Sequence, residues 1–218
     1  NNIDPRNDLN FNLLGISKKY KSFSSISYNN VGLNNSAEDY FSMSASLEDI
    51  QNEDFYAKKI IPENIFMSNF DTQRANINNQ LAVSNNLIYR FSQKLSLKAN
   101  ISFLNDKITF LENNNTFFNT ENINYNDQSE TIKKPINKQL GFKLTYNTSK
   151  VSLLEIETAI QSEKINTSNS IVQNNNTFFN TSLKTENIFW NNKIQYTYKI
   201  SNNKALQYIS NFSIKFCI

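Results

Sequence analysis

Apolar and polar residues alternate over two neighbouring stretches of the chain. In residues 77–91 most odd positions hold apolar side chains, and after the polar residues 92–94 the odd positions of 95–103 do so again. Alternation with a period of two predicts β-strands that have one apolar and one polar face. Two such strands joined by a short polar connection predict an antiparallel hairpin.

The same unit recurs along the chain, with a weaker copy near the start. The pattern therefore predicts an all-β fold of about eight strands arranged as antiparallel hairpins. The predicted strands are residues 9–17, 22–32, 76–91, 95–104, 138–146, 151–160, 183–200 and 205–217.

The connections between these strands alternate in length. The short polar ones are residues 18–21, 92–94, 147–150 and 201–204, and the long Asn-rich ones are about 33–75, 105–137 and 161–182. Short turns at one end and long loops at the other are typical of outer-membrane β-barrels, where the turns are periplasmic and the loops extracellular. The sequence thus predicts hairpins that form part of a transmembrane β-barrel.

This interpretation assigns a role to each face of the strands. The apolar positions are expected to face lipid: Leu81, Val83, Leu87, Leu95, Leu97, Ile101, Leu140, Phe142, Leu144, Ile194, Leu206, Phe212 and Ile214. Aromatic residues near the short turns are expected to form a girdle at the membrane interface. These residues are Tyr20, Tyr89, Phe91, Tyr146 and Tyr198.

A soluble or surface-anchored β-sandwich, acting as a binding module or adhesin, is the alternative. Alternating strands are also the signature of a sandwich, and aromatic residues beside turns could fill the edge of its core. However, a sandwich usually has short connections at both ends, and an alternating stretch of about 15 residues is long beside a typical strand of about 5–6. The combination favours the barrel.

Composition narrows the possible functions. The net charge of +3 is too small to predict a nucleic-acid partner. The chain has no His, and its single Cys217 rules out a disulfide framework, so we expect no cofactor, no metal site and no enzymatic activity. A mean hydropathy of −0.55 fits a membrane barrel, because only the outer face of each strand needs to be apolar.

Two features could carry binding chemistry. The octapeptide NNNTFFNT occurs at 113–120 and again at 174–181. Its residues Phe117, Phe118, Phe178 and Phe179 could stack on a ligand in the extracellular loops, although duplicated low-complexity sequence explains the repeat as well. Glu155 and Glu157 lie two residues apart on a strand and are expected to point the same way, into a solvated lumen.

Several segments resemble the barrel portion of TonB-dependent outer-membrane receptors of Bacteroidota. They are KKYKSFSSISYNNVGLN, LEDIQNEDFYAKKIIPENIF and YNTSKVSLLEIETAI, together with the Lys-containing hairpin turns in SQKLSLKANISFLNDKIT and SNNKALQYISNFSI. The resemblance is one of barrel style over nearly the whole chain and involves no catalytic motif.

The resemblance implies a barrel, usually of 22 strands, that is closed by an N-terminal plug and lies in the bacterial outer membrane. Such receptors import scarce nutrients, such as iron chelates, glycans or peptides, with energy from the TonB complex. The implied partners are outer-membrane lipid, the remainder of the same barrel with its plug, and TonB through that plug. The sequence has no plug-like domain, TonB box or signal peptide, so this chain alone is expected not to transport.

The connections also predict where the chain ends lie. If residues 18–21 and 201–204 are periplasmic turns, the first strand descends from outside and the last strand ends outside. A complete bacterial barrel normally has both termini in the periplasm. We therefore expect the chain to be an internal part of a larger barrel.

Overall fold

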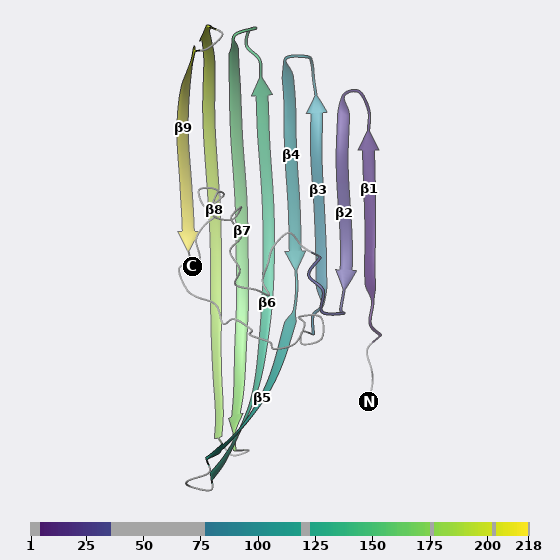
Figure 1. Ribbon diagram of the computed structural model, residues 1–218, viewed down its shortest axis with the longest axis vertical. Helices are drawn as coiled ribbons and strands as arrows, with labels where there is room; N and C mark the ends of the chain where they lie inside the picture. Colours follow the sequence, from purple (N-terminus) through teal and green to yellow (C-terminus); the bar gives the residue numbers. More distant parts are fainter. Residues whose placement is uncertain (1–4, 36–76, 119–122, 175–176, 202–203, 218) are drawn as a thin grey trace.

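A computed structural model describes residues 5–35, 77–118, 123–174, 177–201 and 204–217 (Figure 1). All the strands in these ranges belong to one antiparallel sheet of nine strands. They are β1 (Asp8–Ile16), β2 (Tyr20–Asn29), β3 (Gln80–Arg90), β4 (Leu95–Asn105), β5 (Ile108–Phe118), β6 (Ile123–Tyr146), β7 (Ser152–Gln173), β8 (Thr177–Ser201) and β9 (Lys204–Cys217). The prediction of an all-β, antiparallel fold is confirmed.

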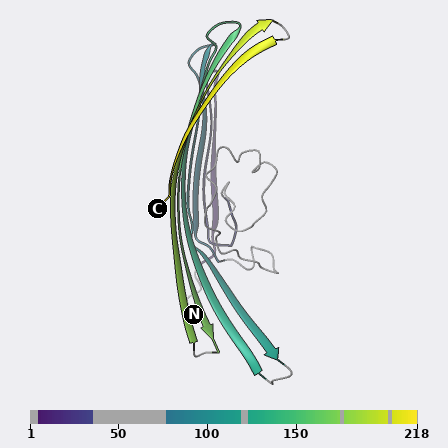
Figure 2. The same ribbon diagram turned by 90° about the vertical axis from the view of Figure 1, so that its left-hand side faces the viewer.

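The strands lie side by side in the order β1-β2-β3-β4-β6-β7-β8-β9, and β5 pairs with β6. Consecutive strands are neighbours except for β4 and β5, which follow one another along the same edge of β6, so the sheet is a meander. Figure 2 shows that the strands bend into an arc and that the sheet is a single layer. No helix in the described ranges is long and apolar enough to span a membrane.

The four connections that were predicted to be short lie together at one end of the sheet (Figure 1), and the equally short β5–β6 and β7–β8 connections lie at the other end. The turn between β3 and β4 is fixed by Phe91, whose backbone N–H donates to the carbonyl of Leu95, and by Ser92, whose hydroxyl accepts from the Leu95 N–H. Strand limits at this end agree with the expected limits within two residues. At its other end β2 stops at Asn29, and Gly32 then adopts a positive φ of 82°.

Two of the three long connections were predicted wrongly. Residues 105–137 were expected to form a loop, but they contain β5 and the first half of β6. Residues 161–182 were also expected to form a loop, but β7 runs on to Gln173 and β8 begins at Thr177. The count of eight strands is corrected to nine, because these segments pair with each other through a continuous ladder despite having no apolar face. Most of the third connection, 33–75, lies outside the described residues, as do residues 47–66 of the family resemblance.

The ladder on one side of β6 changes partner at Pro135. β4 pairs with β6 as far as Asn105↔Ile136, and β5 begins pairing at Ile108↔Lys133. Pro135 therefore faces the junction between β4 and β5, where its carbonyl accepts a hydrogen bond of 3.0 Å from the Asp106 N–H. Proline lacks a backbone N–H, and it is tolerated within this long strand because the missing donor points at the break in the neighbouring ladder.

The buried residues are few and lie near this junction. Ala82, Leu104, Ile108 and Ile165 form a small apolar cluster. Around it, most of the buried side chains are polar, including Asn29, Gln80, Asp106, Lys133, Asn137 and Glu163. Most of these side chains lie on the same side of the sheet as Gln80, the side with more polar residues. In a soluble sandwich the apolar side of each sheet is the buried one, so this sheet shows the reverse.

Candidate functional site: an apolar band and a polar pocket on opposite faces

Cross-strand pairing places the expected lipid-facing residues on one face of the sheet. Residues that are directly opposite in adjacent strands point to the same side. Pairing connects Tyr89, Leu97, Leu144, Ile156 and Ile194 in one row from β3 to β8. The neighbouring rows follow the same parity, so all thirteen residues predicted to face lipid share this face. We call their side of the sheet the apolar face and the other side the polar face.

The apolar face is uncovered. Phe11 on β1 is 62% exposed and Leu206 on β9 is 64% exposed, and residues between them such as Ile194 and Ile101 are also exposed. Among the described strands there is no second sheet that packs on them. Soluble monomers rarely expose apolar patches of more than a few hundred Å², so a contiguous apolar face of this kind marks a surface for contact with protein or membrane.

The apolar face forms a band of limited height. On β8 it runs from Tyr198 to Ile188, and beyond that point Glu186 forms an ion pair of 3.6 Å with Lys164 of β7 on the same side. The ten steps between these two residues, each with a rise of about 3.4 Å and tilted by about 45°, cover about 24 Å. This matches the apolar band of outer-membrane barrels, which is about 25 Å tall.

Tyrosines line the edge of the band next to the short turns. Tyr20 pairs directly with Tyr89, and the Tyr89 ring makes an edge contact with Phe91 at 4.8 Å between centroids. Tyr146 and Tyr198 lie on the same face at the corresponding ends of β6 and β8. The pair Tyr196–Tyr208 adds to this row. The pair was not among the predicted interface aromatics, although Tyr196 lies two residues before Tyr198 and therefore on the same face of the strand.

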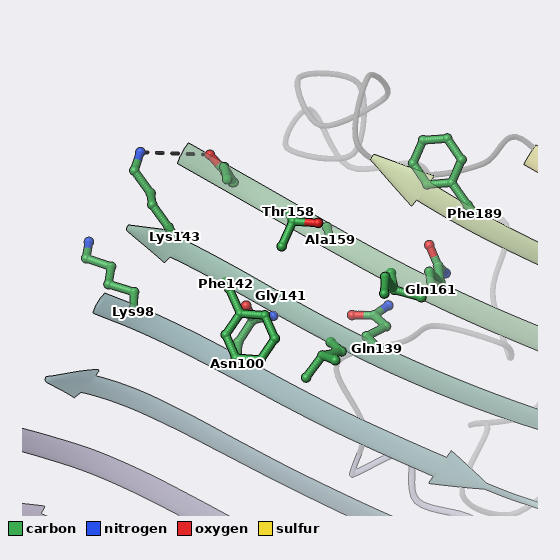
Figure 3. Close-up of a pocket in the computed structure, with 13 residues that line it drawn as sticks. Lys98, Asn100, Gln139, Gly141, Phe142, Lys143, Thr158, Ala159, Gln161 and Phe189 are labelled. Atoms are coloured by element: carbon green, nitrogen blue, oxygen red, sulfur yellow. Dashed lines mark ion pairs between the residues drawn. The ribbon is translucent and has the colours of Figure 1, made fainter. Parts of the chain in front are cut away.

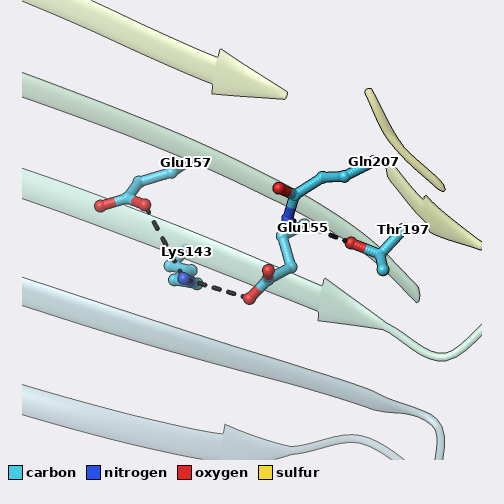
Figure 4. Close-up of polar contacts among 5 residues, drawn as sticks. All are labelled: Lys143, Glu155, Glu157, Thr197 and Gln207. Carbon is cyan, nitrogen blue, oxygen red and sulfur yellow. Dashed lines mark hydrogen bonds and ion pairs between the residues drawn. The ribbon is translucent and has the colours of Figure 1, made fainter. Parts of the chain in front are cut away.

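The polar face carries the two glutamates that were expected to point the same way. The Lys143 ammonium lies 3.1 Å from Glu155 Oε1 and 3.9 Å from Glu157 Oε2 (Figure 4). Farther along the same face, the Gln207 amide donates to the Thr197 hydroxyl at 3.5 Å. This face is not uniformly polar, because Leu14, Ile16, Phe23 and Ile88 occupy it near the turn between β1 and β2.

A pocket of about 350 Å³ opens on the polar face, over β4, β6, β7 and β8 (Figure 3). Gly141 forms part of its floor, and the Asn100 side chain lies across this glycine. The other polar-face residues of the pocket are Lys98, Gln139, Lys143, Glu157, Ala159, Gln161 and Phe189. Nothing in the sequence alone grouped these residues, because they come together only through the register of four strands.

A buried amide network fixes residues 30–35 against the polar face. Gln80 donates 3.0 Å hydrogen bonds to Asp106 Oδ2 and Asn34 Oδ1, and its Oε1 accepts from the Asn35 N–H at 2.8 Å. Asn78 donates to Asn29 Oδ1 at 2.9 Å. Burial raises the pKa of Asp106, which lies beyond the apolar band, and hydrogen bonds from Gln80 and two backbone N–H groups partly oppose this effect.

The described residues of the two octapeptide copies are 113–118, which end β5, and 174 and 177–181, which lead into and begin β8. The copies approach each other across Asn126, which pairs with Asn115 on one side and exchanges hydrogen bonds with Asn174 on the other. The phenylalanines do not converge. Phe117 and Phe178 are both exposed on one side, but three ladders separate them, and Phe179 lies on the opposite side. The Phe118 side chain lies outside the described part of the chain.

Comparison with known proteins does not name a family for this chain. No protein-family model matches it, and no curated protein matches it. Within the described ranges, no group of three or more Cys, Asp or Glu side chains is placed to hold a metal ion. Function must therefore be inferred from the two faces of the sheet.

Proposed function

We propose that the chain forms part of the wall of an outer-membrane β-barrel that belongs to a TonB-dependent nutrient receptor. The observation that carries this proposal is the uncovered apolar band, which is bordered by tyrosines and backed by a polar face. In a bilayer the band faces lipid, the tyrosines lie at the headgroup level, and the polar face lines a lumen. The bacterial outer membrane is the corresponding location.

The two edges of the sheet support a larger barrel. The outer edges of β1 and β9 have no partner strand among the described residues. Unpaired backbone N–H and C=O groups find no water in the bilayer core, and their burial there costs several kcal/mol each. A sheet in a membrane must therefore close into a ring. In this proposal the remaining strands and a plug complete the barrel, and the plug couples it to the TonB complex.

The transport role rests on the family resemblance together with this arrangement. An iron chelate, a glycan or a peptide would enter from the side where β6, β7 and β8 extend beyond the band, and would pass along the polar face. Strands of 24, 22 and 25 residues exceed the roughly 9–11 residues that crossing requires. Their outer halves form long hairpins on the extracellular side.

The β-sandwich alternative makes a different demand on the same residues. A sandwich buries the apolar face against a second sheet at a spacing of about 10 Å. The part of the chain that the structure describes supplies no such sheet. The curvature in Figure 2 and the polar character of the more buried face both favour a barrel wall.

Electrophoresis of the intact protein tests the proposal. Folded outer-membrane barrels resist SDS until they are heated, whereas sandwiches generally do not. We expect the protein to be recovered with outer membranes and to change its migration after boiling. Recovery in the soluble fraction with unchanged migration would contradict the membrane assignment.

A further inference from the structure

The pocket on the polar face combines three kinds of lining that suit one class of ligand. Its volume of about 350 Å³ lies within the usual range for small-molecule sites of about 300–1,000 Å³. A charged end, a set of amides and the Phe189 ring line it on the polar face (Figure 3).

Two lysines and one glutamate, Lys98, Lys143 and Glu157, line the charged end of the pocket. Lys98 of β4 is directly opposite Lys143 of β6. Lys143 is held by Glu155 and Glu157, whereas Lys98 makes no ion pair with any described residue. Like charges that face each other across a ladder are destabilising. An anion placed beside Lys98 would offset this repulsion and would form a charge-assisted hydrogen bond.

The middle of the pocket is lined by amides. Asn100, Gln139 and Gln161 contribute their side chains. Side-chain amides both donate and accept, so they suit hydroxyl groups, which do the same.

The depth of the pocket depends on Gly141. A Cβ at this position would lie within 3.0 Å of Asn100 Cγ, so the glycine leaves room for the Asn100 amide to lie close to the sheet. At the far side, Phe189 of β8 is buried and offers an apolar surface. A ring with one apolar face and several hydroxyls would fit between these residues.

We propose that this pocket binds a hydroxylated carboxylate about the size of one sugar ring. The carboxylate lies at Lys98, the hydroxyls contact Asn100, Gln139 and Gln161, and the apolar side of the ring lies against Phe189. The inference rests on the proposed function in one respect: the pocket faces the lumen of a barrel only if the sheet closes.

Calorimetric titration of the intact, detergent-solubilised protein tests the site, with glucuronate as the probe and glucose and acetate as comparators. We expect glucuronate to bind more tightly than either comparator. Lys98→Met should weaken glucuronate binding by about tenfold or more and leave glucose binding unchanged, because only the carboxylate contact is lost. Lys98→Arg, which keeps the charge, should retain glucuronate binding.

Lys21→Met is the matched control. Lys21 lies on the same face in the same cross-strand row, connected to Lys98 through Ile88, but it does not line the pocket. The Lys21→Met variant should bind glucuronate as tightly as the unmodified protein does. The inference is overturned if folded protein shows no saturable glucuronate binding, if Lys98→Met binds as well as the unmodified protein, or if Lys21→Met loses as much affinity as Lys98→Met.

These outcomes are distinguishable from failure of the proposed function. Protein that shows heat-modifiable migration but does not bind glucuronate overturns the ligand site alone. Protein that binds glucuronate through Lys98 but shows no heat-modifiable migration overturns the membrane barrel alone.

Discussion

The indole Nε1 of Trp190 donates a hydrogen bond of 3.0 Å to Thr158 Oγ1. Both residues lie on the apolar face, where Trp190 also makes an edge contact with Phe212 at 6.5 Å between ring centroids. In hydrocarbon no water is present to satisfy the indole N–H. Thr158, one of the few polar residues in the band, is therefore explained as the partner of the tryptophan.

Removing this acceptor should destabilise the protein in lipid. We expect Thr158→Val to lower the free energy of unfolding in lipid vesicles by about 1–3 kcal/mol, because the indole N–H is left without a partner. Thr158→Ser keeps the hydroxyl and should cost less. Trp190 is the only tryptophan, so its fluorescence reports the transition directly. Equal stability of the Val variant and the unmodified protein in vesicles would contradict the lipid assignment of this pair.

Arginine on the apolar face should block membrane assembly. We expect Phe142→Arg to cost about 2–4 kcal/mol, as near the bilayer midplane, and Leu97→Arg, whose position pairs with Tyr89 closer to the edge of the band, to cost less. Ser96→Arg is the matched control, because Ser96 is adjacent to Leu97 but lies on the polar face. Assembly is measured as the heat-modifiable fraction in outer membranes. If both apolar-face variants assembled as well as Ser96→Arg, the lipid-facing side would be assigned wrongly.

Asp106 should make stability depend on pH. Burial raises the pKa of its carboxyl above the usual 3.8, so the folded protein holds this proton more tightly than the unfolded chain does. The stability that Asp106 contributes is therefore fully present below pH 3.8 and is lost as the pH rises through the raised pKa.

Asp106→Asn removes this titration and keeps an oxygen for the Asn79 and Lys107 N–H groups, which donate to Oδ1 at 3.2 and 2.7 Å. We expect the free energy of unfolding of the unmodified protein, relative to this variant, to fall as the pH rises from about 4 towards neutrality. Unfolding curves at a series of pH values measure the difference. A difference that stays constant or grows with pH would contradict the assignment.

The Tyr20 ring lies over Gly15, which has no side chain of its own to cover the backbone. A Cβ at Gly15 would lie 2.9 Å from Tyr20 Cε1 and 2.9 Å from Ser22 Oγ. We expect Gly15→Ala to destabilise the protein by about 1–3 kcal/mol because the ring must move. The effect should be smaller in a Tyr20→Ala background, and a double-mutant cycle of unfolding measures this coupling. Additive effects would show that the two residues do not interact.

The sequence was sufficient to predict the parts of the sheet that have one apolar face. Alternation in residues 77–91 and 95–103 predicted β3, β4 and the turn between them, and the same reasoning predicted which residues of β6 and β8 share a face. In these segments apolar side chains recur at every second position, so the period is visible in the sequence.

The outer halves of β6, β7 and β8 could not be predicted in this way. Beyond the band the positions of the apolar face become polar, as at Lys164 and Glu186 or at Ser168 and Ser182, so the alternation is lost. Asparagine and the internal Pro135 also argue against strand on local propensity. Ladder hydrogen bonds to neighbouring strands override these preferences, and a single sequence does not reveal those neighbours. The pocket was missed for the same reason.

The ladder between β2 and β3 differs from the others in the length of chain that separates its two strands. Most neighbouring strands are joined by a few residues, whereas β2 and β3 pair across residues 30–79. By loop length alone, closing a connection of this length costs about 2 kcal/mol more in chain entropy than closing a four-residue turn. The strands from β3 to β9 can therefore pair in succession through local contacts, and the hairpin of β1 and β2 is expected to join the sheet last.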